Sequence, residues 1–234
     1  MNRKKLENFW YYNKWLVIGG AALLVLLLHL ILSVAGAEKE AFSGILLNCA
    51  QREEKSALAA DFSGYAGIDP DQSVVNFDSS IQLTREGTEQ NIQAFQAILA
   101  RVAAEQVDFI VANQENFCLY SYNSSGIFCD LRDCFSEEVL QLLEGHIFYI
   151  DRAFETLILE NADNADFFEN LEFPDAFHPE NMEEPVPMGI GIGSCEAFLD
   201  SYSSGGEAVY LGILSNAPHS DLAAQLVLYL HGLD

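Results

Sequence analysis

The sequence predicts an α/β fold, as one three-layer domain with a largely parallel or mixed sheet, preceded by one transmembrane helix. Two observations predict it. Short β-rich apolar runs alternate with segments whose apolar residues recur at helical spacing, which is typical of a sheet covered by helices on both faces. An uncharged apolar run of helical length precedes them. The 234 residues suit one ordinary domain and an N-terminal appendage.

The appendage is the apolar segment 15–36, which contains no acidic or basic residue apart from the weakly titrating His29. About 20 such residues cross the hydrocarbon of a bilayer as a helix. We therefore expect the chain to contact the lipid bilayer through residues 15–36, with 37–42 as a linker and 43–234 as the α/β domain.

The distribution of basic residues predicts how this helix is oriented. Four basic residues precede the span, and the first one after it is Lys39. Because basic residues are retained on the cytoplasmic side, residues 1–14 should be cytoplasmic and the C-terminal domain extracellular, in a single-pass protein of the cell membrane. The alternative is a signal peptide cut after Ala37, since residues 35–37 fit the small-x-small pattern. Either alternative exports the domain.

Net charge restricts the partners. The part after the span holds seven basic and 34 acidic residues, a net charge of −27. Nucleic acid is excluded as a partner, because a phosphate backbone requires a basic surface. Such acidity is typical of a soluble surface, and a cationic partner or Ca²⁺ is the alternative. The acidic stretches 69–71 and 161–166 lack the frame of an EF-hand, so we expect no metal and no cofactor.

The exported part contains five cysteines, so at least one is unpaired. Cys129 and Cys134 can form a disulfide only if their Cα atoms come within about 7 Å, which a turn allows and a strand does not. The spacings do not fit a zinc site. We interpret most of these cysteines as small buried residues. Whether two of them form one disulfide is left undecided by the sequence. The five are Cys49, Cys118, Cys129, Cys134 and Cys195.

The elements of the domain follow from periodicity and capping residues. Thr88 and Ser136 are good helix N-caps, and Gly145 is a stop signal. Residues 154–160 fit a helix or a strand, and 161–184 are predicted as a long surface excursion with one short helix. The expected strands are 43–48, 73–77, 107–112, 146–150, 188–192 and 208–214, and the main expected helices are 53–65, 88–102, 136–145, 194–202 and 218–230.

Candidate chemistry is sparse. The glycine-rich run 189–195 ends in Ser194 and Cys195 and could form an anion-binding or nucleophile loop at a helix N-terminus. Its spacing is not G-x-G-x-x-G, and no P-loop Lys follows it. The histidines show no metal-site spacing. We therefore predict that the protein is not an enzyme.

Several segments resemble the type 2 extracytoplasmic solute-binding proteins of bacterial ABC importers. Residues 107–117 (VDFIVANQENF) resemble the family's "aDvfi" strand and the helix after it. Residues 126–131 (GIFCDL) look like its "G.f.DL" segment, and 210–230 are similar to its late strand and "s..p..A..fi.fl" helix. A full member has two lobes, whereas the chain has room for a second lobe only between about Leu131 and Pro185, so it resembles a single or truncated lobe.

The resemblance implies a membrane-anchored extracytoplasmic binding module for a small solute, without catalysis. Ligands in such folds bind at the carboxyl ends of the strands. The alternative is an envelope structural or assembly component whose acidic domain docks on a subunit of another membrane complex. If the resemblance holds, the ligand-binding residues are those at the strand ends, namely Asn48, Asp78, Ser79, Asn113 and Gln114.

Overall fold

The computed structural model describes residues 23–25, 39–52, 58–83, 89–123, 126–164, 167 and 171–233. Contacts divide the chain into two units, Met1–Lys39 and Glu40–Asp234. In the first unit, residues 23–25 are helical with exposed side chains, and the rest of the predicted membrane span 15–36 lies outside the described residues. Within the described ranges, no helix combines the length and apolar composition needed to cross a membrane.

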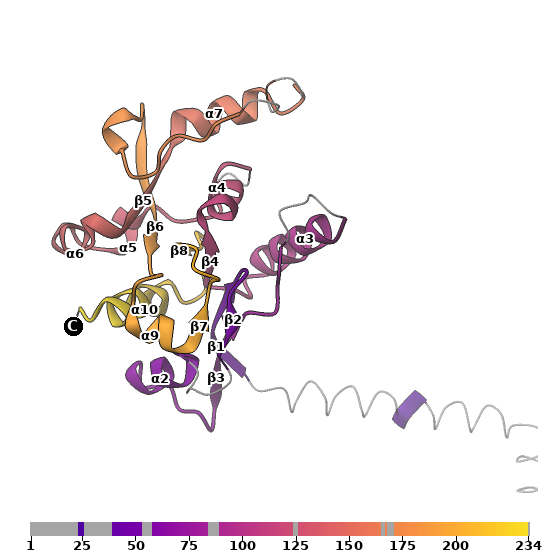
Figure 1. Cartoon of the computed structure of the whole chain (residues 1–234). Coiled ribbons are helices and arrows are strands. Elements are labelled where there is room, and N and C mark those ends of the chain that lie inside the picture. The colour runs from indigo at the N-terminus through magenta and orange to yellow at the C-terminus, as the bar shows by residue number, and fades with distance from the viewer. Residues whose placement is uncertain are drawn as a thin grey trace, which may run out of the picture. The chain divides into compact units, whose positions relative to one another are not determined.

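The second unit is built on a six-stranded sheet, which confirms the predicted α/β class (Figure 1). The strand order is β3-β1-β4-β8-β6-β5. β1 and β4 are parallel, whereas β4 with β8, β8 with β6 and β6 with β5 are antiparallel, so the sheet is mixed. Its strands are β1 (Lys39–Leu46), β3 (Ser73–Asp78), β4 (Phe109–Asn113), β5 (Ile147–Asp151), β6 (Pro185–Gly191) and β8 (Val209–Ile213).

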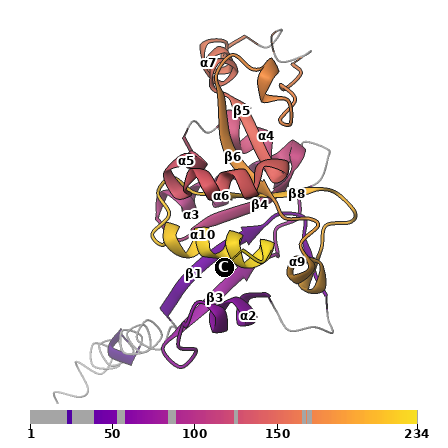
Figure 2. The same ribbon diagram turned by 90° about the vertical axis from the view of Figure 1, so that its left-hand side faces the viewer.

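Helices cover both faces of this sheet, which makes three layers (Figures 1 and 2). One layer contains α2 (Leu58–Tyr65), α5 (Leu131–Cys134), α6 (Glu137–Leu142), α9 (Glu196–Ser201) and α10 (Ser220–His231). The opposite layer contains α3 (Glu89–Ala103), α4 (Gln114–Asn123) and α7 (Arg152–Glu160). The 3₁₀ helices are η1 (Glu144–His146) and η2 (Pro179–Asn181).

Strand β4 shows why two separate apolar cores form. Successive side chains of a strand point to opposite faces. Phe109 and Val111 therefore enter the core beside α2 and α10, while Ile110 and Ala112 enter the core beside α3 and α4. All four are at most 1% exposed, so β4 reads as a continuous apolar run, as a strand buried on both faces should.

Most predicted elements are present. Ser136 caps α6 as predicted, because its Oγ accepts a hydrogen bond from the N–H of Val139. The ambiguous segment 154–160 is helical, within α7. In α3, Ile92 is 57% exposed, whereas Ile98 is fully buried.

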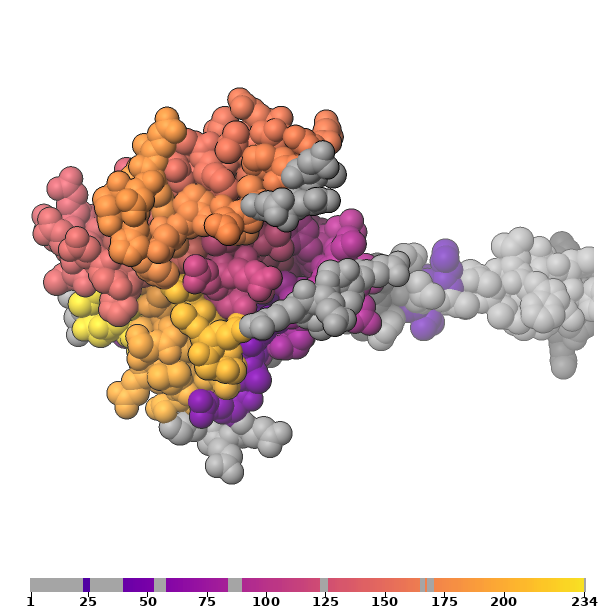
Figure 3. Space-filling view, turned by 45° about the horizontal axis from the view of Figure 1, so that its top comes forward, coloured from indigo at the N-terminus to yellow at the C-terminus, as the bar shows by residue number. Residues whose placement is uncertain are grey.

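The chain between β5 and β6 is a surface excursion that consists of α7 and of the segment 161–184, which the sequence predicts to lie at the surface and whose described part contains η2 and loops. Figure 3 shows the orange residues of this region on the surface of the domain. Asp151 fixes both of its ends. Its carboxylate accepts hydrogen bonds from Ala153 N at the start of α7 and from Glu183 N and Glu184 N just before β6. The Asp151 carboxylate therefore joins the two ends of the excursion by hydrogen bonds.

Candidate functional site

The order of the strands creates a crevice between β1 and β4. Along the chain, β3 follows β1 through α2 and lies on one side of β1, and β4 follows β3 through α3 and lies on the other side. The next strand of the sheet along the chain after β4 is β5, at the opposite edge from β3, so the connections leave β1 and β4 in opposite directions. In α/β sheets, ligands bind at the carboxyl ends of the strands at such a switch point.

Asn48 follows the carboxyl end of β1 and has a left-handed backbone, with φ of 55°. Asn tolerates this conformation better than most non-glycine residues. Its Oδ1 accepts a hydrogen bond of 2.6 Å from Leu83 N, and its own N–H donates to Ile81 O. The half-buried Asn48 thus holds the segment after β3 over the end of β1.

Asn113 is the last residue of β4. Its Oδ1 accepts hydrogen bonds from Asn116 N at 3.1 Å and Asn116 Nδ2 at 2.8 Å, which caps the start of α4. Its Nδ2 donates to Glu207 Oε2 at 2.5 Å. Asn113 therefore joins α4 to the loop before β8 from the end of the central strand.

A short antiparallel ladder between β2 and β7 places the turn that forms the opposite wall of the crevice. β2 (Ala50–Gln51), which follows Asn48 closely, pairs with β7 (Tyr202–Ser203). Ser204 and Gly205 come directly after β7, and a hydrogen bond from Ser204 Oγ to Glu207 O closes their turn. The ladder thus brings the turn over the carboxyl ends of β1 and β4.

These segments enclose a pocket of about 280 Å³, near the lower end of the range for small-molecule sites. Its surface is mainly amide, hydroxyl and carboxylate. Glu115 and Glu207 are the charged residues among the described ones that line it, and none of those described lining residues is basic. The field in the pocket therefore favours a neutral or cationic polar ligand over an anion. The lining residues are Asn48, Leu83, Asn113, Glu115, Asn116, Ser204, Gly205 and Glu207.

Two of the five residues predicted for the site, Asn48 and Asn113, therefore meet in one pocket. The other three do not line it. Asp78 ends β3 and is engaged by Ser80 Oγ at 2.6 Å and by Arg101 Nη1 at 2.7 Å. Burial opposes ionisation of Asp78, but these hydrogen bonds and the Arg101 charge hold its pKa below the ordinary value.

Ser79 and Gln114 occupy less specific positions. Ser79 is partly exposed and its carbonyl accepts a hydrogen bond from Gln82 Nε2 at 3.4 Å. Gln114 is exposed at the first position of α4, directly after Asn113.

The glycine-rich run 189–195 has a packing explanation. A Cβ atom on Gly189 would lie 2.5 Å from the ring of Phe117, so only glycine fits beneath that ring. The run continues into the short helix α9, and burial raises the pKa of the Cys195 thiol to about 11. A protonated thiol is a poor nucleophile, so this cysteine is not activated.

Six residues of the pocket were not predicted from the sequence. Asn116 could have been found, because it lies three residues after Asn113 at a helix start, where a second amide would face the first. Ser204, Gly205 and Glu207 had no such signal. They reach the pocket only through the pairing of β2 with β7, which joins segments about 150 residues apart.

Comparisons with protein-family models, with curated proteins and with solved structures gave no match. The resemblance to one lobe of a solute-binding protein therefore stays a prediction from the sequence. The function proposed below depends on the geometry of the pocket and on the sequence patterns.

Proposed function

We propose that this protein is a membrane-anchored extracytoplasmic binding module that takes up a small polar solute, neutral or cationic, in the pocket of Asn48 and Asn113. The single observation that supports it most is the position of this pocket, at the carboxyl ends of two adjacent parallel strands where the connections diverge. The amides of Asn48, Asn113 and Asn116 offer both donors and acceptors to such a solute.

The proposed cellular location is inferred from the sequence. An uncharged segment at residues 15–36, with basic residues before it and a strongly acidic domain after it, supports an N-terminal anchor with the domain outside the cell membrane. A cleaved signal peptide would export the same domain. The binding proposal is therefore independent of which alternative holds.

The module is proposed to bind without catalysis. The described residues that line the pocket include no His, Cys or Lys, and the Ser204 hydroxyl donates to the backbone oxygen of Glu207 and not to a base that would activate it. The carboxylates of Glu115 and Glu207 are on exposed residues. A catalytic carboxyl is usually buried, because burial raises its pKa, and these two carboxyls are not buried.

A second candidate is an envelope component that docks on another membrane complex. The excursion between β5 and β6 favours it, because four large apolar side chains there are well exposed: Leu157, Leu159, Phe173 and Phe177, at 42%, 50%, 37% and 44%. Exposed apolar side chains of this size are common in protein contacts, and Leu159 of α7 is the most exposed of the four.

A thermal-shift screen of the full-length chain in detergent micelles separates the two candidates. The library holds neutral polar solutes such as amides and sugars, cationic solutes such as polyamines, and anions of matched size. We expect hits among the first two groups, with about 2.7 kcal/mol of stabilisation at a hundredfold excess over Kd.

Two neighbouring variants make the screen specific. Asn113→Ala should reduce the shift by about half or more at the same solute concentration, as a tenfold loss of affinity requires, whereas Gln114→Ala, an exposed neighbour outside the pocket, should retain it. Hits whose shift is unchanged in Asn113→Ala, or hits confined to anions, would reject the pocket. A screen without hits, together with co-purification of a membrane complex that Leu159→Ser weakens, would favour the docking component.

A further inference from the structure

Two cysteines in the layer of α5 lie in contact. The sulfur atoms of Cys129 and Cys134 are 2.6 Å apart, only about 0.6 Å more than the length of a disulfide bond. Cys49, Cys118 and Cys195 are buried at separate places in the cores. Of the five cysteines in the sequence, these two are therefore the pair that the fold brings together.

Main-chain hydrogen bonds beside each cysteine hold the two sulfur atoms close together. Cys129 N donates a hydrogen bond of 2.9 Å to Ile213 O, which attaches Cys129 to β8. Asp130 caps α5 through Arg132 N, and Phe135 N closes the helix on Leu131 O directly after Cys134. The proximity of the two sulfurs is thus set by the main chain and by the turn of α5.

We propose that Cys129 and Cys134 are joined by an intrachain disulfide that fastens α5 to the end of β8. The bond would lie in the wall of a cavity of about 640 Å³, which both cysteines line. This inference concerns a different part of the domain from the pocket of Asn48 and Asn113, and it does not depend on the proposed ligand.

The bond forms by thiol–disulfide exchange with an external disulfide, for which oxidised glutathione is the probe. The Cys134 thiolate attacks one glutathione sulfur, forms a mixed disulfide and releases one glutathione thiolate, which takes up a proton. Cys129 then loses its proton, its sulfur attacks that of Cys134, and the second glutathione leaves as a thiol. Two protein thiols are oxidised and one glutathione disulfide is reduced to two thiols.

The surroundings suit Cys134 as the attacking sulfur. The hydrogen bond between the two sulfurs lowers the pKa of the Cys134 thiol and, together with burial, raises that of Cys129. Asp130 and Asp133 lie on either side of Arg132 and line the same cavity. Their charges should slow reduction of the bond by anionic thiols such as glutathione more than by neutral dithiothreitol.

The sequence provides a direct test. Trypsin cuts after Arg132, between the two cysteines, and gives peptides 102–132 and 133–152. The full-length chain is equilibrated with oxidised glutathione, alkylated under denaturing conditions and digested without reductant. We expect the two peptides to be linked and three cysteines to be alkylated.

Variants identify the sulfur in peptide 102–132, which also contains Cys118. The linked pair should persist in Cys118→Ala and be lost in Cys129→Ser. Dithiothreitol should lower the Tm of the wild-type chain by about 4–8 °C, as expected for a short closed loop in a domain of this size, and leave Cys129→Ser unchanged. Five alkylated cysteines, or a link that survives Cys129→Ser, would overturn the proposal.

Discussion

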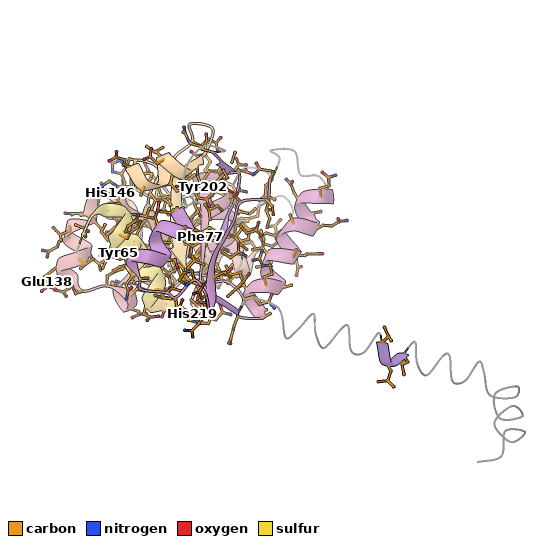
Figure 4. All side chains as sticks on the ribbon, turned by 90° about the horizontal axis from the view of Figure 1, so that it is seen from below. Tyr65, Phe77, Glu138, His146, Tyr202 and His219 are labelled. Atoms are coloured by element: carbon orange, nitrogen blue, oxygen red, sulfur yellow. The ribbon has the colours of Figure 1, made fainter. Side chains whose placement is uncertain are left out.

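The two ends of β4 carry polar residues with opposite environments. At the amino end, Asp108 is 1% exposed, and its carboxylate accepts hydrogen bonds of 2.8 Å from Ser43 N in β1 and from His219 N before α10. At the carboxyl end, the half-buried Asn113 lines the pocket of about 280 Å³. Asp108 also lines a cavity, of about 530 Å³, but its buried carboxylate is bound by the backbone. In Figure 4 the label of His219 lies at the lower edge of the domain, and that of Tyr202, in β7, lies nearer the upper edge.

The difference separates a structural polar residue from one available to a ligand. Both oxygens of Asp108 are used by backbone N–H groups of other elements, so its bonds hold the sheet and α10 together. The Oδ1 of Asn113 caps α4, and its Nδ2 donates to the side chain of Glu207, an exposed residue. Burial and the kind of partner distinguish the two roles, although both residues flank the same apolar strand.

The largest effect is expected from Asp108→Ala. It leaves the N–H groups of Ser43 and His219 without their acceptor in the interior, which should lower the free energy of unfolding by about 3 kcal/mol. Urea unfolding followed by circular dichroism measures this loss. Asp71→Ala, at an exposed turn, is the control and should change stability by less than about 0.5 kcal/mol. A loss below about 1 kcal/mol for Asp108→Ala would contradict the structural role assigned to Asp108.

Asp151 extends the comparison, because it is a second buried carboxylate bound by backbone N–H groups. Burial raises its pKa, but the hydrogen bonds from Glu183, Glu184 and Ala153 outweigh burial and hold the pKa below the ordinary value. The stabilisation is therefore present above the unfolded pKa of about 3.9 and is lost as pH falls through that value toward the folded pKa.

Asp151→Asn tests that stabilisation. We expect a loss of about 1–2 kcal/mol at pH 7 that shrinks toward zero at low pH, because the wild-type carboxyl is then protonated as well. Urea midpoints between about pH 7 and pH 2.5 measure it. A difference between variant and wild type that does not change with pH would contradict the assigned role.

The smallest effect on stability is expected from Asn113→Ala. Loss of the cap on α4 should cost about 1 kcal/mol. The same substitution should weaken binding of a pocket solute at least tenfold, measured by calorimetric titration. A loss of stability equal to that of Asp108→Ala would instead assign Asn113 a structural role.

The sequence predicts the elements well because local signals control them. The alternation of apolar runs and helical faces locates β4 and α3, and Ser136 marks the start of α6. The sheet order is harder, because the antiparallel insertion of β8 between β4 and β6 depends on long-range pairing that periodicity does not encode. For this reason the sequence does not decide between a largely parallel sheet and a mixed one.

The candidate site could be predicted only in part, for the same reason. Asn48 and Asn113 follow apolar runs, and parallel neighbours place both at one edge of the sheet. The same rule selects Asp78, which is engaged instead by Arg101 from α3. Which strand end remains open depends on helix packing and on the β2–β7 ladder, and neither leaves a local pattern.

The most direct test of the central claim is the response of the pocket amides to a bound solute. A ¹⁵N-labelled full-length chain in detergent micelles is titrated with the best neutral or cationic hit, and the side-chain NH₂ signals of Asn48, Asn113 and Asn116 are followed. We predict that these signals shift together and saturate with one affinity, while that of Gln114 stays in place. Saturable shifts confined to residues outside the pocket would contradict the account.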